Sequence, residues 1–186
     1  MDSAASWWTS ERWCNDMPER ILHTSPVTGI TPEEILKTVL VSELLAPSSQ
    51  LWLLSPWITD VVALNNRDGN FDHLLADPEP RRYRLSELLS EVISSGARLT
   101  VIMRRDPHNL PFQSSLERRC DPNRLSLIEY HGAHEKTFCG TDWVVTGSMN
   151  FTIRGMEYND EGVTYKIDSA AAATTRLELT HRWSRI

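Results

Sequence analysis

The sequence has few cysteines and no apolar stretch long enough for a membrane span. Its three cysteines, Cys14, Cys120 and Cys139, form neither an even set nor a C-x-x-C pair. This argues against a disulfide framework or a zinc site and favours reduced thiols. No apolar run approaches the roughly 20 residues that cross a bilayer, and the first residues lack the basic and apolar regions of a secretory signal. We therefore expect a cytoplasmic protein without a membrane partner.

Positive charge is also scarce, with 19 lysines and arginines against 25 acids and a net charge of −6. This is unexpected for a free-standing nucleic-acid-binding protein, because cations that neutralise phosphates supply most of that affinity. The arginines are grouped, however, and a group can line a local groove or simply form a solvated face that balances acids. These groups are Arg81, Arg82 and Arg84; Arg104 and Arg105; and Arg118, Arg119 and Arg124. Weak intrinsic affinity would mean that partner proteins deliver the substrate.

With 186 residues, of which 40% are hydrophobic, the chain is long enough for one domain with a core and too short for two ordinary ones. Residues 1–30 carry Trp7, Trp8 and Trp13 without clear periodicity. We expect an N-terminal arm whose tryptophans pack on their own domain or on a partner subunit. Residues 31–186 then form the domain itself.

Alternating helix and strand signals predict an α/β fold in that domain. Thr31 as N-cap, with Pro32 next and two glutamates in the first turn, predicts a helix through about Leu45. The apolar run 51–58 predicts a strand buried on both faces. Further helices are expected near 85–94, 111–119 and 170–183, and strands near 98–104 and 125–130. The long polar loop 65–80 is expected to shape substrate access.

One short stretch carries the polar groups for attack on a phosphodiester. His134 precedes Lys136 by two residues, which on a β-strand places both side chains on one face. Ser148 and Asn150, in Gly147-Ser148-x-Asn150, have the same spacing at a second strand or its end. Neutral imidazole can attack phosphorus, while a lysine, a hydroxyl and an amide hold the charged oxygens. This chemistry requires neither a metal ion nor a cofactor.

These residues resemble the phospholipase D superfamily signature, H-x-K-x4-D-x6-G-S-x-N followed by N-x-E. The later element matches Asn159 and Glu161, and the resemblance assigns Glu161 a hydrogen bond that orients the histidine ring. It also implies a mixed, largely parallel β-sheet with helices on both faces, in a single domain. Asp142 departs from the pattern, because it follows Lys136 by six residues instead of five and the lysine-to-glycine segment is one residue short.

The resemblance extends to small bacterial endonucleases of the superfamily that carry one motif per chain. The mechanism needs two imidazoles, so a symmetric homodimer is implied, with His134 and Lys136 of both chains around one phosphate. Within the chain, His131 and His108 are the alternative proton donors. The HEK, GSMNFT and SPWITDV segments also resemble the phospholipase D-like proteins of 7-deazaguanine DNA modification and restriction systems, which implies partner proteins of an anti-phage defence complex.

The segment after the strand near 98–104 is the expected substrate-binding region. Arg104, Arg105 and Asn109 lie there, beyond the carboxyl end of a strand, where open α/β sheets bind ligands. The sequence thus predicts a metal-independent phosphodiesterase acting on DNA through a phosphohistidine. Two alternatives stay open: a lipid phosphodiesterase, and a non-catalytic module that retains the phosphate site to bind nucleic acid.

Overall fold

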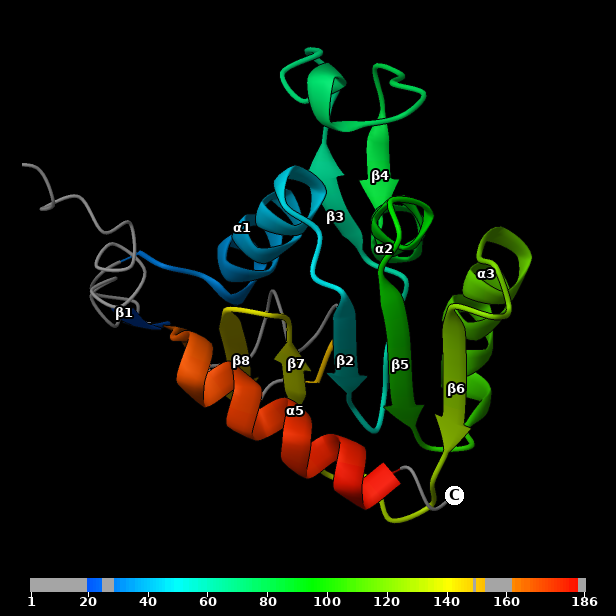
Figure 1. The fold of residues 1–186 in the computed structure, drawn as a ribbon. Coiled ribbons are helices and arrows are strands. Elements are labelled where there is room, and N and C mark those ends of the chain that lie inside the picture. The colour runs from blue at the N-terminus through cyan, green and yellow to red at the C-terminus, as the bar shows by residue number, and fades with distance from the viewer. Residues whose placement is uncertain (1–19, 25–28, 149, 153–161, 184–186) are drawn as a thin grey trace, which may run out of the picture.

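A mixed β-sheet forms the centre of the chain (Figure 1). The structure, a computed structural model, describes residues 20–24, 29–148, 150–152 and 162–183. Within these ranges the sheet has seven strands in the order β1-β9-β8-β7-β2-β5-β6. They are β1 (Arg20–His23), β2 (Gln50–Leu54), β5 (Arg98–Met103), β6 (Leu125–Glu129), β7 (Thr137–Cys139), β8 (Trp143–Gly147) and β9 (Val163–Ile167).

Four helices accompany the sheet in the described part of the chain: α1 (Pro32–Leu45), α2 (Leu85–Ser94), α3 (Leu110–Arg119) and α5 (Ser169–Trp183). All four helices agree with the sequence prediction. Helix α1 begins with a capping box, because the backbone N–H of Glu34 donates to Thr31 Oγ1 at 3.2 Å and Glu34 Oε2 accepts from the Thr31 N–H at 3.0 Å. Thr31 and Glu34, on which the prediction of this helix rested, therefore make the hydrogen bonds that cap its first turn.

Strand direction divides the sheet into two parts. Strands β2, β5 and β6 pair in parallel, whereas β7, β8, β9 and β1 are added by antiparallel pairing. The α/β fold with a mixed sheet is confirmed, and its parallel part is confined to these three strands. Strands β7 and β8 are antiparallel because the tight turn at 140–142 between them can only reverse the chain.

Both faces of the sheet are covered, as the period of two along β2 requires. Leu51 and Leu53 belong to the larger core with the apolar residues of α1, α2 and α3. Trp52 and Leu54 point the other way and pack with Leu179 of α5. The expected helices on both faces are thus confirmed (Figure 1), and the apolar run without alternation is explained by a strand with a hydrophobic layer on each side.

The β7–β8 hairpin is fixed to the core through a buried carboxylate. Glu43 near the end of α1 is 2% exposed. One of its oxygens accepts from the Ser48 N–H, and the other accepts from Ser48 Oγ and from Trp143 Nε1, each at 2.7 Å. A buried carboxylate is tolerated when such donors surround it. Glu43 therefore holds β8, which leads into the Gly-Ser-x-Asn segment, against α1.

A small two-stranded sheet, β3 (Val62–Asn65) with β4 (Arg82–Arg84), extends from the main sheet. It carries the polar loop between residues 66 and 81, including the short helix η2 (Asp72–Leu74). Figure 1 shows this hairpin at one end of the molecule, while β2, β5 and β6 point toward the opposite end, where β7 begins. The loop expected to shape substrate access thus lies at the end of the sheet away from His134.

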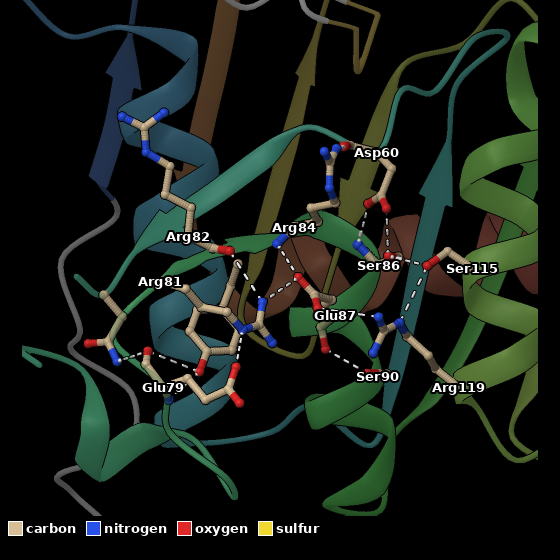
Figure 2. Close-up of polar contacts among 12 residues, drawn as sticks. Asp60, Glu79, Arg81, Arg82, Arg84, Ser86, Glu87, Ser90, Ser115 and Arg119 are labelled. Carbon is tan, nitrogen blue, oxygen red and sulfur yellow. Dashed lines mark hydrogen bonds and ion pairs between the residues drawn. The ribbon is translucent and has the colours of Figure 1, made fainter.

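The arginines of the hairpin take part in a polar network (Figure 2). Glu87 in α2 accepts from the Arg84 backbone N–H at 2.8 Å, and it pairs with Arg81 at 3.1 Å and with Arg119 of α3 at 3.3 Å. The Arg84 side chain donates to the Asp60 carbonyl at 2.6 Å. Arg81, Arg84 and Arg119, considered above as groove residues, therefore join β4 to α2 and α3.

Candidate active site

The candidate site lies at the end of the sheet where β2, β5, β6 and β8 finish and β7 starts. Its segments are fixed by the strand register, since Thr137 of β7 is paired with Leu54 of β2 and with Thr146 of β8. Lys136 and Gly147 are the next residues beyond this last pair. The register therefore brings the histidine–lysine segment and the Gly-Ser-x-Asn segment to the same edge.

His134 and Lys136 were predicted to share the face of a strand, and the structure differs in one respect. They precede β7, which begins at Thr137. His134 is exposed and Lys136 is half-buried. Within the described residues Lys136 has neither an ion pair nor a hydrogen bond. The pair therefore lies in the segment that leads into β7, outside the strand itself.

Arg104, which follows β5, contacts the imidazole directly. Its Nη2 lies 2.9 Å from Nδ1 and 2.8 Å from Nε2 of His134, and its Nε donates to the Ala133 carbonyl at 2.9 Å. A guanidinium can only donate, so it hydrogen-bonds to whichever ring nitrogen carries a lone pair. The contact thus places a fixed cation beside His134.

Trp57 contacts Arg104 directly, and Asp106 holds Trp57 in place. The guanidinium carbon of Arg104 lies 4.8 Å from the centre of the Trp57 ring, a cation–π contact. The Trp57 Nε1–H donates to Asp106 at 3.1 Å, and the backbone N–H of His108 donates to the same carboxylate at 2.9 Å. The His108 N–H, followed by the Trp57 indole, lowers the pKa of Asp106. Asp106 thus fixes the ring on which Arg104 rests.

Asn109 and Arg105, the other two predicted substrate-binding residues, lie differently. Asn109 is 1% exposed. Its side chain accepts from the Ile58 N–H at 2.8 Å and donates to the carbonyls of Pro56 at 3.0 Å and Arg104 at 2.8 Å. Asn109 therefore holds the two loops of the site together. Arg105 is exposed, with a weak surface pair to Glu129 at 3.7 Å.

The Gly-Ser-x-Asn segment leaves β8 beside the start of β9. A Cβ on Gly147 would lie 2.3 Å from the Gly162 carbonyl oxygen, so only glycine allows this approach. The Ser148 N–H donates to the same carbonyl at 3.1 Å, and the Ser148 side chain is exposed. Asn150 Oδ1 is buried and has no hydrogen-bond partner within the described ranges. The motif glycine thus sets the course of the segment that carries Ser148 and Asn150.

The loop after β2 is bound to the same segment, a feature that motif comparison did not identify. The Phe151 N–H faces Ser55 Oγ at 3.4 Å, and the Thr59 N–H donates to the Phe151 carbonyl at 2.7 Å. His108 lies on this side, with Nε2 2.9 Å from Thr59 Oγ1. The sequence signal was Ser-Pro-Trp directly after a buried strand, but its partners are nearly 100 residues away.

The remaining motif residues lie elsewhere. Asp142 occupies the turn at the far end of the β7–β8 hairpin, where its carboxylate accepts from Ser169 Oγ at 3.0 Å beside the start of α5. Its shift from the superfamily spacing thus coincides with a structural contact away from His134. His131 is exposed in the turn before His134. Asn159 and Glu161, and likewise Trp7, Trp8 and Trp13, lie outside the described residues.

The described residues lack two further features. They contain no group of three or more histidine, cysteine or acidic side chains placed to bind a metal ion. None of their helices combines the length and apolarity needed to cross a bilayer.

Comparisons with known proteins identify the fold. Neither a protein-family model nor a curated protein matches the chain. In structure it is similar to Nuc from Salmonella typhimurium, a phospholipase D family member, with a TM-score of 0.59 at 12% identity over 89% of this chain and 95% of Nuc. NucT from Helicobacter pylori gives a TM-score of 0.55 at 13% identity, covering 86% and 92% of the two chains.

A third similar structure is TrmBL2, described as an archaeal chromatin protein with a novel mode of DNA binding. It gives a TM-score of 0.50 at 12% identity over 93% of this chain and 55% of TrmBL2. At such identities the comparisons establish shared architecture. The chain has the fold of a phospholipase D family member, as its motif predicted.

Proposed function

We propose that the protein is a metal-independent phosphodiesterase that cleaves DNA, with His134 as nucleophile. The observation that carries the proposal is the meeting of His134, Lys136 and the Gly147–Asn150 segment at one edge of the sheet, in the fold of a phospholipase D family member. The motif resemblance further suggests that the protein acts in a restriction or anti-phage system with 7-deazaguanine DNA modification. In that system it would be an endonuclease or a nuclease-like subunit.

The proposed reaction has two displacements. A neutral ring nitrogen of His134 attacks phosphorus, the bond from phosphorus to the leaving oxygen breaks, and that oxygen takes a proton from a second imidazole. Water then attacks the phosphohistidine, giving its proton to the second imidazole and releasing His134. Lys136 Nζ, Ser148 Oγ and the Asn150 amide hold the non-bridging oxygens, whose charge increases in the transition states. Glu161 orients the imidazole.

The second imidazole is assigned to His134 of a symmetric partner subunit. A two-fold axis beside the exposed His134 would place two such rings on opposite sides of one phosphate. Of the in-chain alternatives, His131 lies in the preceding turn, and His108 is engaged with Thr59 across the site. Arg104 and Arg105 would bind the flanking phosphates, and Arg104 would exchange its contact with His134 for one with the substrate.

The test is cleavage of plasmid DNA in EDTA by the wild-type protein and matched variants. Wild-type protein should nick the plasmid. His134→Ala should lower the rate by more than about a thousandfold and Lys136→Met by about a hundredfold or more. The control is His73→Ala, because His73 is exposed in η2 on the distant hairpin. Cleavage that requires added magnesium, or that survives His134→Ala, would contradict the mechanism.

A non-catalytic DNA-binding subunit is the second candidate. It is favoured by the fold shared with TrmBL2, whose description names DNA binding. The same variants separate the two functions. DNA binding that persists in His134→Ala, with no cleavage by the wild-type protein of either modified or unmodified plasmid, would favour the binding subunit.

A further inference from the structure

A cavity of about 300 Å³ opens beside His134 on the face of the sheet that α5 covers. Its apolar wall is formed by Leu54 of β2, Ile102 of β5 and Trp183 at the end of α5, with Tyr130 opposite. Tyr130 and Trp183 meet edge to face at 5.1 Å between ring centres. A cavity of this size is at the lower end of ligand sites. His134, the proposed nucleophile, is therefore one of the residues that line this cavity.

Two features of the aromatic pair point to a ligand. Tyr130 is 45% exposed although most large apolar side chains of the described residues are buried. Trp183 is 8% exposed, and it lines the cavity beside Tyr130. The cavity thus offers an apolar stacking surface that includes a largely exposed aromatic ring.

The charges around the cavity restrict what the flat group is. Arg182, which lines the cavity, pairs with Glu135, and Arg104 lies against His134 at the mouth. Glu135 also lines the cavity and balances Arg182, so Arg104 is the remaining guanidinium beside it. This cation disfavours a quaternary ammonium such as choline, although aromatic side chains can bind one, and it favours a group carried on a phosphate backbone. Nucleobases meet both requirements, because every base has a π-face and is carried on a phosphate backbone.

We propose that this cavity is a subsite for one unstacked nucleobase next to the scissile phosphate. This inference rests on the proposed nuclease function and adds a substrate class to it: the nucleotide at His134 is single-stranded or turned out of the duplex. The base packs on Tyr130 and over Leu54 and Ile102, beside Trp183. Its phosphate then lies at His134.

The experiment is an NMR titration that follows the indole N–H signal of Trp183, which is assigned by its loss in Trp183→Phe. The probes are thymidine 5′-monophosphate, 2-deoxyribose 5-phosphate and phosphocholine. Thymidine monophosphate should shift the signal and bind about tenfold more tightly than the sugar phosphate, because of base stacking. Tyr130→Ala should remove this difference and leave sugar phosphate binding unchanged. Leu45→Ala, a loss of an exposed apolar side chain on α1, should change neither.

Equal binding of the two phosphates, or a response of Trp183 to phosphocholine and not to the nucleotide, would overturn the proposal. Because Tyr130 is largely exposed, its truncation should leave the fold intact, which circular dichroism can verify. The readout is independent of turnover. Nucleotide binding at Trp183 without plasmid cleavage would refute the nuclease and keep the subsite, whereas cleavage without base discrimination would do the reverse.

Discussion

Arg104 contacts three other groups of the candidate site. In the structure its guanidinium is shared between the His134 ring, the Ala133 carbonyl and the Trp57 face. A charged group held in place before the substrate arrives needs little reorganisation to bind a phosphate. Arg104 is therefore placed to contact an anion bound beside His134, the proposed nucleophile.

A salt titration tests this role of Arg104. Arg104→Met should weaken DNA binding about equally across sequences and reduce the slope of log K against log salt by about one, because one phosphate contact is lost. Fluorescence anisotropy at several salt concentrations measures both quantities. Arg82→Met is the matched control, since Arg82 is an exposed arginine on β4 at the distant hairpin. An unchanged slope in Arg104→Met would show that Arg104 does not neutralise phosphate.

The two described cysteines should react slowly with alkylating reagents. Burial raises the pKa of Cys120 and of Cys139 to about 11. At pH 8 both are therefore thiols, and the thiolate is the reactive form. Iodoacetamide should modify them more than about tenfold more slowly in the folded protein than in guanidinium, as measured by mass spectrometry of the separate peptides. Rapid labelling of either one in the folded protein would contradict the burial seen here.

At the residue level the motif could be read from the sequence, but the residues that hold the motif segments in place could not. His134, Lys136, Ser148 and Asn150 could be proposed from the sequence because their spacing is a local property. Ser55, Trp57 and Asn109 have no such spacing, because each acts through a partner that the fold brings from elsewhere. Asn109 was predicted to contact substrate on its position after a strand, whereas its amide is buried against backbone groups of two loops.

At the scale of elements, one acid joins β4, α2 and α3. Burial tends to raise the pKa of Glu87, but the Arg84 N–H and the Arg81 guanidinium outweigh it, so the pKa is lowered below its usual value. A lowered pKa in the folded state stabilises the fold above the unfolded pKa, and this stabilisation is lost as the pH falls through the folded value. The anchoring of the hairpin should therefore weaken in acid.

Urea unfolding of Glu87→Gln measures this dependence. The variant should be less stable than wild type by about 1–2 kcal/mol at pH 7, since hydrogen bonds to a charged acceptor are lost. The difference should shrink as the pH falls below the usual pKa of glutamate and through the lowered pKa of Glu87, where the wild-type carboxyl also becomes neutral. Glu178→Gln, at an exposed position of α5, should show no such trend. A difference that stays constant with pH would refute the role of the ionised carboxylate.

Elements with their own boundary signals were predictable, and those fixed by pairing were not. Helix α1 begins at its capping box and α2 spans 85–94, both as predicted. Strand β1 lies within the expected N-terminal arm, because pairing with β9 makes residues 20–23 a strand. Likewise β7 starts at Thr137, because that is the first residue that pairs with Leu54 of β2 and Thr146 of β8. His134 therefore precedes the strand.

At the scale of the whole molecule, the main open prediction is that the site is shared between two chains. Wild-type and His134→Ala chains can be unfolded together and refolded in varied ratios. If each site needs both histidines, mixed dimers are inactive and cleavage falls as the square of the wild-type fraction, to about one quarter in an equal mixture. A linear fall would indicate that each chain supplies its own proton donor. His108 would then be the first residue to replace.

The β3–β4 hairpin has a practical consequence for such experiments. Its turn around Gly69, which has φ +72°, is at the other end of the sheet from the His134 edge (Figure 1). An affinity peptide or fluorophore inserted there would leave the histidine edge accessible both to DNA and to a second subunit. The hairpin thus offers a point at which single molecules can be attached to a surface and observed during a reaction.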